Sequence, residues 1–356
     1  MKLPETDVKN VAERFMKTQL NKNDEIEVSD VNYINIGNEN DVYSFIAGIK
    51  TDGIIVKKDL IIRIFAGFYA DERAKNEYSN LQKLKIAGYP VPELSGMDLS
   101  GIYIDRPFFI MERIIGKNLH DALNNADEKT YDRLMDAWIE LFIDLHKLDC
   151  SDFKEGGFFL KTLFPYVSIF DQEHPFSSID NYINSCKFLL NIYHGENEFS
   201  KPLEWLEEHK FEVPCVKPSV IHQDFNDNNI LVDNLEKLYV IDWSGMDISD
   251  FRLDLASVIQ VWTKYKDLKL RDRILSTYEK MSGSSVDHIE YFEAAACLRK
   301  ILLASVSLNN NINKHGIKSN DEVNQELLQY QSTYNYWLKI TGISIPLMEN
   351  VNTSSN

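Results

Sequence analysis

The chain has 356 residues, of which 44% are hydrophobic and 12% are aromatic, and its formal net charge at pH 7 is −17. This length exceeds a single compact core and predicts two lobes or domains, while the apolar content predicts a packed interior. The excess of carboxylates argues against nucleic acid and against anionic membrane as partners.

Cysteine spacing and apolar runs restrict the class of protein further. The four cysteines lie far apart and form no C-x-x-C pair, which argues against a zinc site and against a disulfide framework. The first residues lack the apolar stretch of a signal peptide, and no apolar run approaches the roughly 18 residues that span a bilayer. We therefore expect a soluble, cytoplasmic protein, either a monomer or a homodimer.

The first part of the sequence predicts a helix followed by an antiparallel sheet. Residues 7–20 place their apolar side chains on one side of a helix. The tetrapeptide Lys-Thr-Asp-Gly at 50–53 predicts a hairpin. Four β-rich stretches are separated by turn residues, at 34–37, 42–46, 54–56 and 60–65.

Arg63 is the one charged residue in the apolar stretch 60–65. On an alternating strand it lies on the opposite face from Ile62 and Ile64. Glu77 follows 14 residues later, at the start of a run with leucines at helical spacing. Arg63 therefore either points to solvent or pairs with the carboxylate of Glu77.

The middle of the chain predicts an extended passage, a strand and a long helix. Residues 87–93 read Ala-Gly-Tyr-Pro-Val-Pro-Glu, which ends the preceding helix at the glycine and continues as extended chain through the prolines. Residues 107–112 predict an apolar strand. From Tyr131 to Leu148, apolar residues recur at intervals of three and four, which predicts a long buried helix.

Residues 151–217 are irregular and rich in aromatic side chains. Glu204, Glu207 and Glu208 are interleaved with them and could meet a cationic ligand, while the rings could stack on a sugar or a quaternary amine. The alternative is that these side chains only pack the helices together.

The segment from His222 to Trp243 has the residue types and spacing of a phosphoryl-transfer site. Asp224 follows His222 by two residues, Asn229 follows Asp224 by five, and Asp242 comes 13 residues later. A strand, a turn and a second strand between Asn229 and Asp242 would bring those two side chains close together. Phosphoryl transfer needs a carboxylate to orient the attacking hydroxyl, for which Asp224 is suited, and oxygen ligands for Mg²⁺, for which Asn229 and Asp242 are suited.

A simpler interpretation of the same segment is a surface hairpin in which Asp and Asn residues only make turns. The apolar runs on both sides and the fixed spacing of His222, Asp224, Asn229 and Asp242 favour the phosphoryl-transfer interpretation.

This segment resembles the aminoglycoside phosphotransferase and choline kinase group of small-molecule phosphotransferases. Its residues fit the group's H-x-D-x-x-x-x-N loop and I-D-[WF] strand end, and residues 87–92 match its A-G-x-P-V-P stretch. The resemblance covers about residues 30–260. Gln223 replaces a frequent glycine and Asn226-Asp227-Asn228 replaces a frequent His-Pro-Gly, so the resemblance leaves the subfamily and the substrate open.

The resemblance implies an α+β fold, the bilobal protein-kinase-like fold with a β-rich N-lobe and an α-helical C-lobe. The N-lobe would span residues 1–112 and hold the nucleotide phosphates. The C-lobe would span 113–356 and carry the catalytic and metal-binding loops, with the insertion 151–217 contributing to the acceptor pocket. The polar end of the chain, 350–356, is expected to be disordered.

The resemblance also implies roles for individual residues. Asp224 would be the catalytic residue, and Asn229 and Asp242 would bind Mg²⁺. Arg63, held by Glu77, would bind the nucleotide phosphates, at a position where the family usually has Lys. The cofactors would be Mg²⁺ and ATP, with GTP as the alternative nucleotide.

Further roles concern the backbone and the support of the catalytic loop. The backbone of Glu112 and Ile114 would bind adenine, with Met111 as the back wall of the adenine site. Residues 37–43 would form the loop over the ATP phosphates. His222 and Asp254 would support the catalytic loop, and Asp254, at the start of a helix, could also cap it.

The expected acceptor is a hydroxyl group of a small molecule. The acidity of residues 113–356 and their aromatic content favour an aminoglycoside or another cationic or amino-sugar acceptor, and choline, homoserine, methylthioribose and fructosamine are alternatives. A protein kinase is disfavoured, because Asn226 stands where such kinases have Lys and only 12 residues separate Asp242 from Asp254. A catalytically silent nucleotide-binding pseudokinase is the competitor from another class.

Overall fold

The computed structural model divides the chain into two compact units, each built from two segments. Unit 1 comprises Met1–Tyr131 and Asp227–Gly245, and unit 2 comprises Asp132–Asn226 and Met246–Asn356. The predicted boundary at residue 112 separates two functional lobes. It stays a prediction, because the two compact units are defined by their internal contacts and not by function. The structure describes residues 2–19, 24–34, 40–153, 174–193, 196–215, 217–315 and 327–353.

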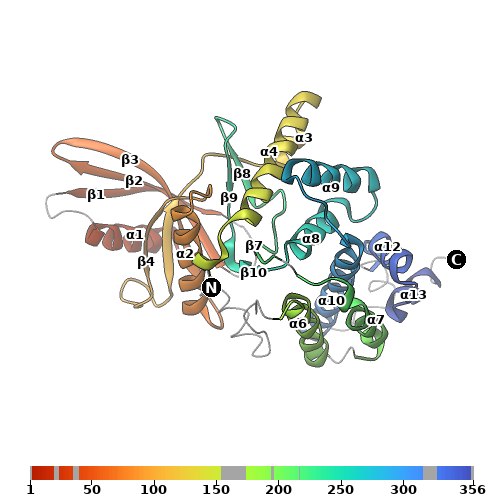
Figure 1. The fold of residues 1–356 in the computed structure, drawn as a ribbon. Coiled ribbons are helices and arrows are strands. Elements are labelled where there is room, and N and C mark those ends of the chain that lie inside the picture. The colour runs from red at the N-terminus through yellow and green to blue at the C-terminus, as the bar shows by residue number, and fades with distance from the viewer. Residues whose placement is uncertain are drawn as a thin grey trace. The chain divides into compact units, whose positions relative to one another are not determined.

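The main feature of unit 1 is a five-stranded antiparallel sheet (Figure 1). Helix α1 precedes it in the chain and helix α2 connects β3 to β4. The strands lie in the order β1 (Glu25–Ile34), β2 (Asn40–Thr51), β3 (Ile54–Phe65), β5 (Phe108–Glu112) and β4 (Leu94–Asp98).

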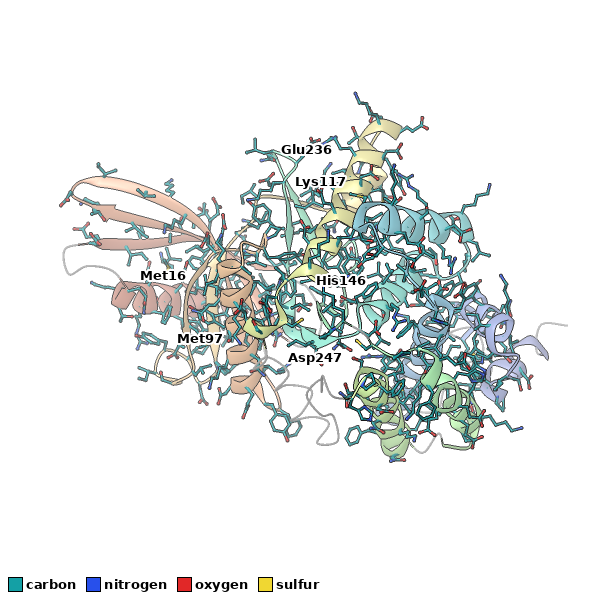
Figure 2. All side chains as sticks on the ribbon, viewed as in Figure 1. Met16, Met97, Lys117, His146, Glu236 and Asp247 are labelled. Carbon is teal, nitrogen blue, oxygen red and sulfur yellow. The ribbon has the colours of Figure 1, made fainter. Side chains whose placement is uncertain are left out.

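The two faces of this sheet pack against different helices. Helix α1 (Glu5–Gln19) buries Phe15 and Met16 in a core that includes Ile62 and Ile64 of β3 (Figure 2). Helix α2 (Ala70–Ile86) packs on the face that carries Arg63. Side chains alternate along a strand, so one apolar strand supplies a hydrophobic core on one face and a single cation on the other. The predicted orientation of Arg63 is confirmed.

The β2–β3 hairpin is confirmed, and it is longer than the sequence predicts. Thr51 pairs with Ile54, and the two turn residues Asp52 and Gly53 have φ angles of 51° and 82°. Positive φ at both turn positions is the type I′ geometry that Asp-Gly favours. The two β-rich stretches at 54–56 and 60–65 form one continuous strand.

The sequence prediction missed most of strand β1, which begins at Glu25. Of the stretch expected at 34–37, Ile34 belongs to β1, and residues 35–39 lie outside the described part of the chain. The register shifts between Ser29 and Asn32, where Asp30 has a φ of 52°. A bulge of this kind breaks the simple alternation of apolar residues that would reveal the strand in the sequence.

The second sheet of unit 1 has three short strands. They are β6 (Gly116–Asn118), β8 (Ile230–Asp233) and β9 (Leu238–Val240), with β8 in the centre. Gly116 faces Val232 so closely that a Cβ atom would collide with the Val232 carbonyl. The strand–turn–strand predicted between Asn229 and Asp242 is confirmed. Two helical segments complete the unit, α3 (Leu119–Asn124) and η3 (Trp243–Gly245).

Unit 2 is mainly helical, and α10 (Ile289–His315) packs against helices from several parts of the sequence. The two-stranded sheet of β7 (Ser219–Ile221) and β10 (Asp247–Ser249) lies next to the segment that carries Asp224. The other elements are α4 (Glu128–Lys147, which begins in unit 1), η1 (Cys150–Phe153), α6 (Ser177–Tyr193), α7 (Glu196–His209), η2 (Lys210–Glu212), α8 (Phe251–Thr263), α9 (Leu268–Ser282), α12 (Gln331–Thr341) and α13 (Pro346–Thr353).

The end of the chain is more helical than its composition indicates. The Asn-rich stretch 309–313 has the composition of a loop, but it lies within α10. The expected disordered tail, 350–356, is helical up to Thr353, and residues 354–356 lie outside the described part. In both places helix α10 or α13 continues through polar residues, which the apolar pattern does not reveal.

The α+β class predicted from the sequence is confirmed by an antiparallel sheet in one unit and a predominance of helices in the other. Within the ranges that the structure describes, there is no helix both long enough and apolar enough to span a bilayer.

Candidate functional site

Unit 1 contains a cavity that brings together six of the predicted site residues. Its volume is about 390 Å³, and it has apolar walls from Val42, Ile61, Leu231 and Ile241. Residues far apart in the chain meet here, because β2, β3, β5 and β8 each contribute to the wall. The predicted residues in the lining are Arg63, Met111, Glu112, Ile114, Asn229 and Asp242.

Arg63 bridges two carboxylates of this unit. Its Nη1 lies 3.0 Å from Oε1 of Glu77, and its Nη2 lies 3.0 Å from Oδ1 of Asp242. The predicted pairing of Arg63 with Glu77 is confirmed. The planar guanidinium can reach both carboxylates at once, which the single ammonium group of Lys cannot do with the same geometry.

Glu77 is almost completely buried, with 2% of its side chain exposed. Burial raises the pKa of Glu77 to about 7, against the opposite effect of the Arg63 guanidinium, and the charge of Asp242 raises it further. Any ligand that changes the charge around Arg63 should therefore change the pKa of Glu77.

Asn229 and Asp242 flank the β8–β9 hairpin and both line the cavity. The Ile241 N–H donates to the Asn229 carbonyl at 3.0 Å, which ties the two ends of the hairpin together. Asp242 has a φ of 64°, and Trp243, fully buried beside Tyr89, anchors the chain after it. A carboxylate and an amide oxygen at one cavity wall form a donor set that suits Mg²⁺ shared with phosphate oxygens.

The predicted hinge residues lie at the end of β5. The Glu112 N–H donates to the Glu93 carbonyl at 2.7 Å, and the Arg113 N–H donates to the Asp59 carbonyl at 2.9 Å. These two N–H groups are therefore engaged within the protein. The carbonyl of Glu112 and the backbone of Ile114 are the hinge groups that can serve a planar ligand.

Unit 2 holds Asp224 on a segment that Asp254 supports from α8. The Oδ2 atom of Asp254 accepts from the His222 N–H at 2.7 Å, and Oδ1 accepts from the Gln223 N–H at 2.8 Å. Gln223 has a φ of 68°, so the chain turns sharply just before Asp224. His222 is fully buried, and its Nδ1 accepts from the Asp224 N–H at 3.2 Å.

The Asp224 side chain is exposed and is oriented by a neighbour that the sequence interpretation passed over. The amide of Asn226 donates to Oδ1 of Asp224 at 2.6 Å. Phe225, between them, is buried and stacks on Phe142 of α4 at a centroid distance of 4.4 Å. The segment thus buries Phe225 in the core and exposes the side chain of the preceding residue, Asp224, to solvent.

Asp254 does not cap helix α8, contrary to one expectation. The N-cap is Asp250, whose carboxylate accepts from the Arg252 N–H at 2.9 Å. Asp254 lies in the first turn and is 1% exposed. His146 of α4 contacts Asp254 at 3.5 Å and Tyr278 at 2.8 Å, both in the interior of unit 2.

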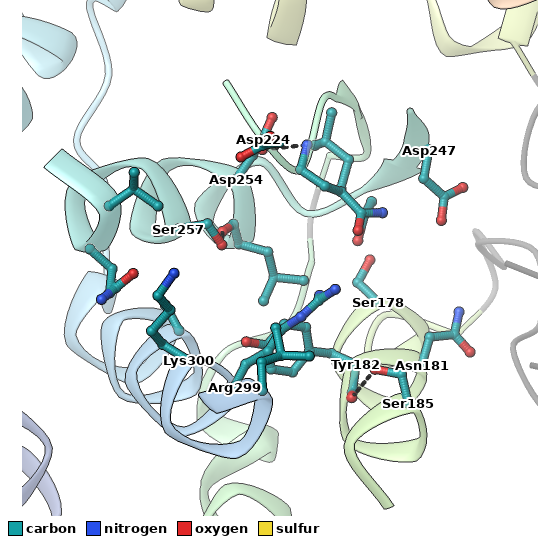
Figure 3. Close-up of a pocket in the computed structure, with 18 of the residues that line it drawn as sticks. Ser178, Asn181, Tyr182, Ser185, Asp224, Asp247, Asp254, Ser257, Arg299 and Lys300 are labelled. Atoms are coloured by element: carbon teal, nitrogen blue, oxygen red, sulfur yellow. Dashed lines mark hydrogen bonds between the residues drawn. The ribbon is translucent and has the colours of Figure 1, made fainter. Parts of the chain in front are cut away.

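A second cavity, of about 240 Å³, lies wholly within unit 2 and has Asp224 in its wall (Figure 3). Asp247 of β10 lines it as well, and so do Arg299 and Lys300 of α10. None of these last three residues was singled out from the sequence. For Arg299 and Lys300 the signal available was a pair of cations between two apolar runs, 294–298 and 301–304.

Two predicted regions fall partly outside the described residues. The loop expected over the nucleotide phosphates, 37–43, is described only from residue 40, and the insertion 151–217 lacks 154–173, 194–195 and 216. The described part of the insertion contributes α6, which lines the unit 2 cavity.

Comparison with known proteins identifies the family. Residues 30–288 match the model of the phosphotransferase enzyme family, which is more than half of the chain. A protein of unassigned function from Metamycoplasma hominis is 24% identical over 262 residues. The match covers 68% of this chain and 50% of that relative, so the chain spans about half of the relative's length.

Solved structures share the fold at low sequence identity. A protein from Ralstonia eutropha JMP134, assigned to the aminoglycoside phosphotransferases, has a TM-score of 0.69 and 15% identity, with 92% of this chain and 98% of that chain covered. The ternary complex of streptomycin, ATP and APH(2″)-IIa has a TM-score of 0.56 and 17% identity, with 95% and 99% covered. A mutant of APH(4)-Ia with AMP-PNP and hygromycin B gives 0.56 and 17%, with 91% and 98% covered.

The family match and the shared fold agree with the resemblance seen in the motif from His222 to Trp243. The chain therefore belongs to the phosphotransferase enzyme family and has the kinase-like α+β fold of these structures.

Proposed function

We propose that this protein transfers the γ-phosphoryl group of ATP to a hydroxyl group of a small molecule in a reaction that depends on Mg²⁺. The observation that carries the proposal is the unit 1 cavity, whose lining combines Arg63, Asn229 and Asp242 with apolar walls and the hinge. Apolar walls suit a nucleobase, and the polar residues suit its phosphates.

The hinge binds the nucleobase, and Arg63 binds the phosphates. The Glu112 carbonyl accepts from the adenine amino group, the Ile114 N–H donates to a ring nitrogen, and Met111 lies against the base. A guanine would present a carbonyl where adenine has the amino group, so the Glu112 carbonyl favours ATP over GTP. Arg63 binds phosphate oxygens as a fork, and Glu77 holds it in place.

Asn229 and Asp242 are the residues that would hold Mg²⁺. When bound, the ion neutralises phosphate charge and supplies the electrostatic stabilisation that phosphoryl transfer needs. The contact of Asp242 with Arg63 holds this carboxylate at the cavity wall in the protein alone. Arg63 compensates the charge of Asp242 in the protein alone, and a bound ion would add to this compensation.

Asp224 acts on the acceptor. Its carboxylate accepts a hydrogen bond from the acceptor hydroxyl and takes the proton as the hydroxyl oxygen attacks the γ-phosphorus. The bond from phosphorus to the bridging oxygen breaks, and ADP leaves. The hydrogen bond from the Asn226 amide to Oδ1 holds this carboxylate in position. Positioning accounts for most of the rate enhancement in this type of reaction.

Composition and the comparisons, taken without the charges of the unit 2 cavity, make an aminoglycoside or another cationic acceptor the first candidate. Its support is the acidic charge of the chain and the aminoglycosides named in the complexes of structural neighbours, streptomycin and hygromycin B. The competing proposal is a nucleotide-binding pseudokinase. The presence of Asp224, Asn229 and Asp242 together favours an active enzyme, since a silent relative has no need for all three.

The test measures ADP release and ADP binding separately in Asp242→Ala and Asp224→Ala. Both variants should lose turnover by about 100- to 1,000-fold or more, because each lacks a group that acts mainly in the transition state. Asp224→Ala should still bind ADP with normal affinity. Glu140→Gln, which neutralises an exposed carboxylate of α4, is the control and should keep full activity. Near-normal turnover in Asp242→Ala would refute the proposal, and wild-type protein that binds ADP but turns over no hydroxyl compound would favour the pseudokinase.

A further inference from the structure

The unit 2 cavity has an uneven distribution of charge. In Figure 3, Asp224, Asp247 and Asp254 lie on one side of it, and Arg299 and Lys300 lie on the other. Asp254 uses both carboxylate oxygens to bind backbone N–H groups, so it contributes little free capacity to the cavity. Among the described lining residues that α6 and α10 contribute, the charged ones are Arg299 and Lys300.

Three helices present polar faces to this cavity, which is unusual for the interior of a helical unit. On α10 the lining residues are spaced three and four apart, as expected for one helix face. On α6 and α8 the faces that line the cavity carry hydroxyl and amide side chains among their apolar residues, where a packed helix has a mostly apolar stripe. The lining residues of this kind are Ser178, Asn181, Ser185, Ser257 and Gln260.

Arg299 and Lys300 differ from the other half-buried cations of unit 2 in their partners. Arg252 pairs with Asp250 at 2.7 Å, and Arg271 pairs with Glu293 at 2.7 Å. Within the described ranges, by contrast, no carboxylate lies within 4.0 Å of the charged groups of Arg299 or Lys300. Arg299 instead lies 5.5 Å from the ring centroid of Tyr182.

Two neighbouring cations that are half-buried without a carboxylate partner favour an anion from outside the protein. Partial removal of a cation from water costs free energy unless an opposite charge compensates it. A guanidinium binds a carboxylate or a phosphate with two parallel hydrogen bonds, and an ammonium adds a mobile point charge beside it. The Tyr182 hydroxyl donates to the Ala295 carbonyl at 2.8 Å, which fixes α6 against α10 around the pair.

We infer that the acceptor of this enzyme is a small hydroxyl compound that carries an anionic group, a carboxylate or a phosphate, which Arg299 and Lys300 bind at the end of the cavity away from Asp224. This inference rests on the proposed function, because Asp224 is taken to act on the acceptor. The cavity volume of about 240 Å³ is below the roughly 300–1,000 Å³ of pockets for drug-sized ligands. A compound of monosaccharide size suits it better than an aminoglycoside of several rings.

The first experiment compares four probes that share one carbon skeleton and differ in charge. Glucose is neutral, glucosamine is cationic, gluconate carries a carboxylate, and glucose 6-phosphate carries a phosphate. Binding is measured by calorimetry on the full-length protein saturated with ADP, so that the nucleotide cavity of unit 1 is filled and cannot bind the phosphate. We expect gluconate or glucose 6-phosphate to bind at least about tenfold more tightly than glucose and glucosamine, since a charge-assisted pair is worth roughly that factor or more.

The second experiment removes the cations. Arg299→Met and Lys300→Met keep apolar stems of similar length, and each should weaken binding of the anionic probe by about 10- to 100-fold. Lys269→Met removes one exposed positive charge of α9 outside the cavity and should leave binding unchanged. ADP affinity should be the same in all three variants, which also shows that each is folded.

The outcomes separate the inference from the proposed function. Tighter binding of glucosamine, equal binding of all four probes, or no binding of either anion by the wild-type protein overturns the inference. A loss of ADP affinity in Arg299→Met overturns it too, because the cation would then serve the nucleotide. Release of ADP is assayed in parallel with each probe and ATP. Turnover of amines without preference for anions leaves the proposed function intact and refutes the inference. Selective binding of anions without any turnover supports the inference and refutes the proposed function.

Discussion

Arg63 connects three elements of unit 1 through its two nitrogen contacts. It projects from β3, pairs with Glu77 of α2, and contacts Asp242 after β9. The strand residue usual in this family, Lys, would deliver one charge to one partner at a time. An arginine that already holds Asp242 fixes the position of a candidate metal ligand before any ligand arrives. An arginine in place of the usual Lys can therefore still bind phosphates, but it also contacts two carboxylates at once.

The raised pKa of Glu77 makes the stability of the protein depend on pH. Burial raises this pKa from 4.5 to about 7, so between these values the folded protein holds a proton that the unfolded chain does not. Unfolding then releases a proton, and the free energy of unfolding falls as the pH rises from about 4.5 to 7. The contribution of Glu77 to this fall is about 3 kcal/mol, from 1.36 kcal/mol for each pKa unit.

Glu77→Gln should remove that contribution. Because Gln has no proton to release, we expect the variant to resemble the wild-type protein in stability near pH 5 and to be the more stable of the two above pH 7. Urea denaturation at several pH values, in a chelating buffer without nucleotide, measures the difference. Parallel stability curves for the two proteins would show that Glu77 has an ordinary pKa.

Individual site residues could be predicted where the signal is local. Asp224, Asn229 and Asp242 lie within 19 consecutive residues, and the short apolar runs around them determine how they fold. Arg63 and Glu77 are also close in sequence, on a strand and the next helix. Arg299 and Lys300 could not be found this way, because their cavity forms from helices more than 100 residues apart. In the sequence they only interrupt an apolar helix face.

Helix α8 supports the segment that carries Asp224. Asp254, one turn into this helix, provides both acceptors for the two backbone N–H groups before Asp224. The helix itself is held in place by its N-cap Asp250 and by the contact of Arg252 with the Pro214 carbonyl at 2.8 Å. Asp254 is accordingly a positioning residue, since it acts through the backbone and not on the acceptor.

Asp254→Asn should lower kcat more than it affects nucleotide binding. The side-chain amide can offer only one oxygen, so one of the two N–H groups would face an NH₂ group and lose its partner, at a cost of about 1–3 kcal/mol. We expect kcat to fall by about 10- to 100-fold, while the affinity for ADP, which unit 1 binds, stays within about twofold. Steady-state kinetics and ADP calorimetry measure the two effects. An equal loss in both would indicate general unfolding instead of a displaced Asp224.

The accuracy of the element predictions depended on whether a pattern was continuous. The hairpin at Asp52-Gly53 and the helix α4 follow regular local rules, and both were located correctly. Strand β1 was missed because its bulge shifts the alternation by one residue, and α10 was ended too early because its last turns are polar.

The two cavities divide the proposed reaction between the two units of the chain. Every lining residue of the nucleotide cavity belongs to unit 1, and every lining residue of the acceptor cavity belongs to unit 2. By the proposed function, each unit recognises its own ligand with its own core as support. Variation in α6, α8 and α10 would then change the acceptor without altering the proposed nucleotide cavity.

This division predicts that each ligand protects a different set of backbone amides. AMP-PNP should slow hydrogen exchange in β3, β5 and the β8–β9 hairpin, because a ligand at 100 times its Kd adds about 2.7 kcal/mol to the stability of the unit that binds it. Gluconate or glucose 6-phosphate, added with ADP present, should slow exchange further in α6 and α10. Arg299→Met should lose only the second effect. If AMP-PNP alone protected α6 and α10 as strongly as β3 and β5, the two units would have to respond as one, and the assignment of a separate ligand to each would fail.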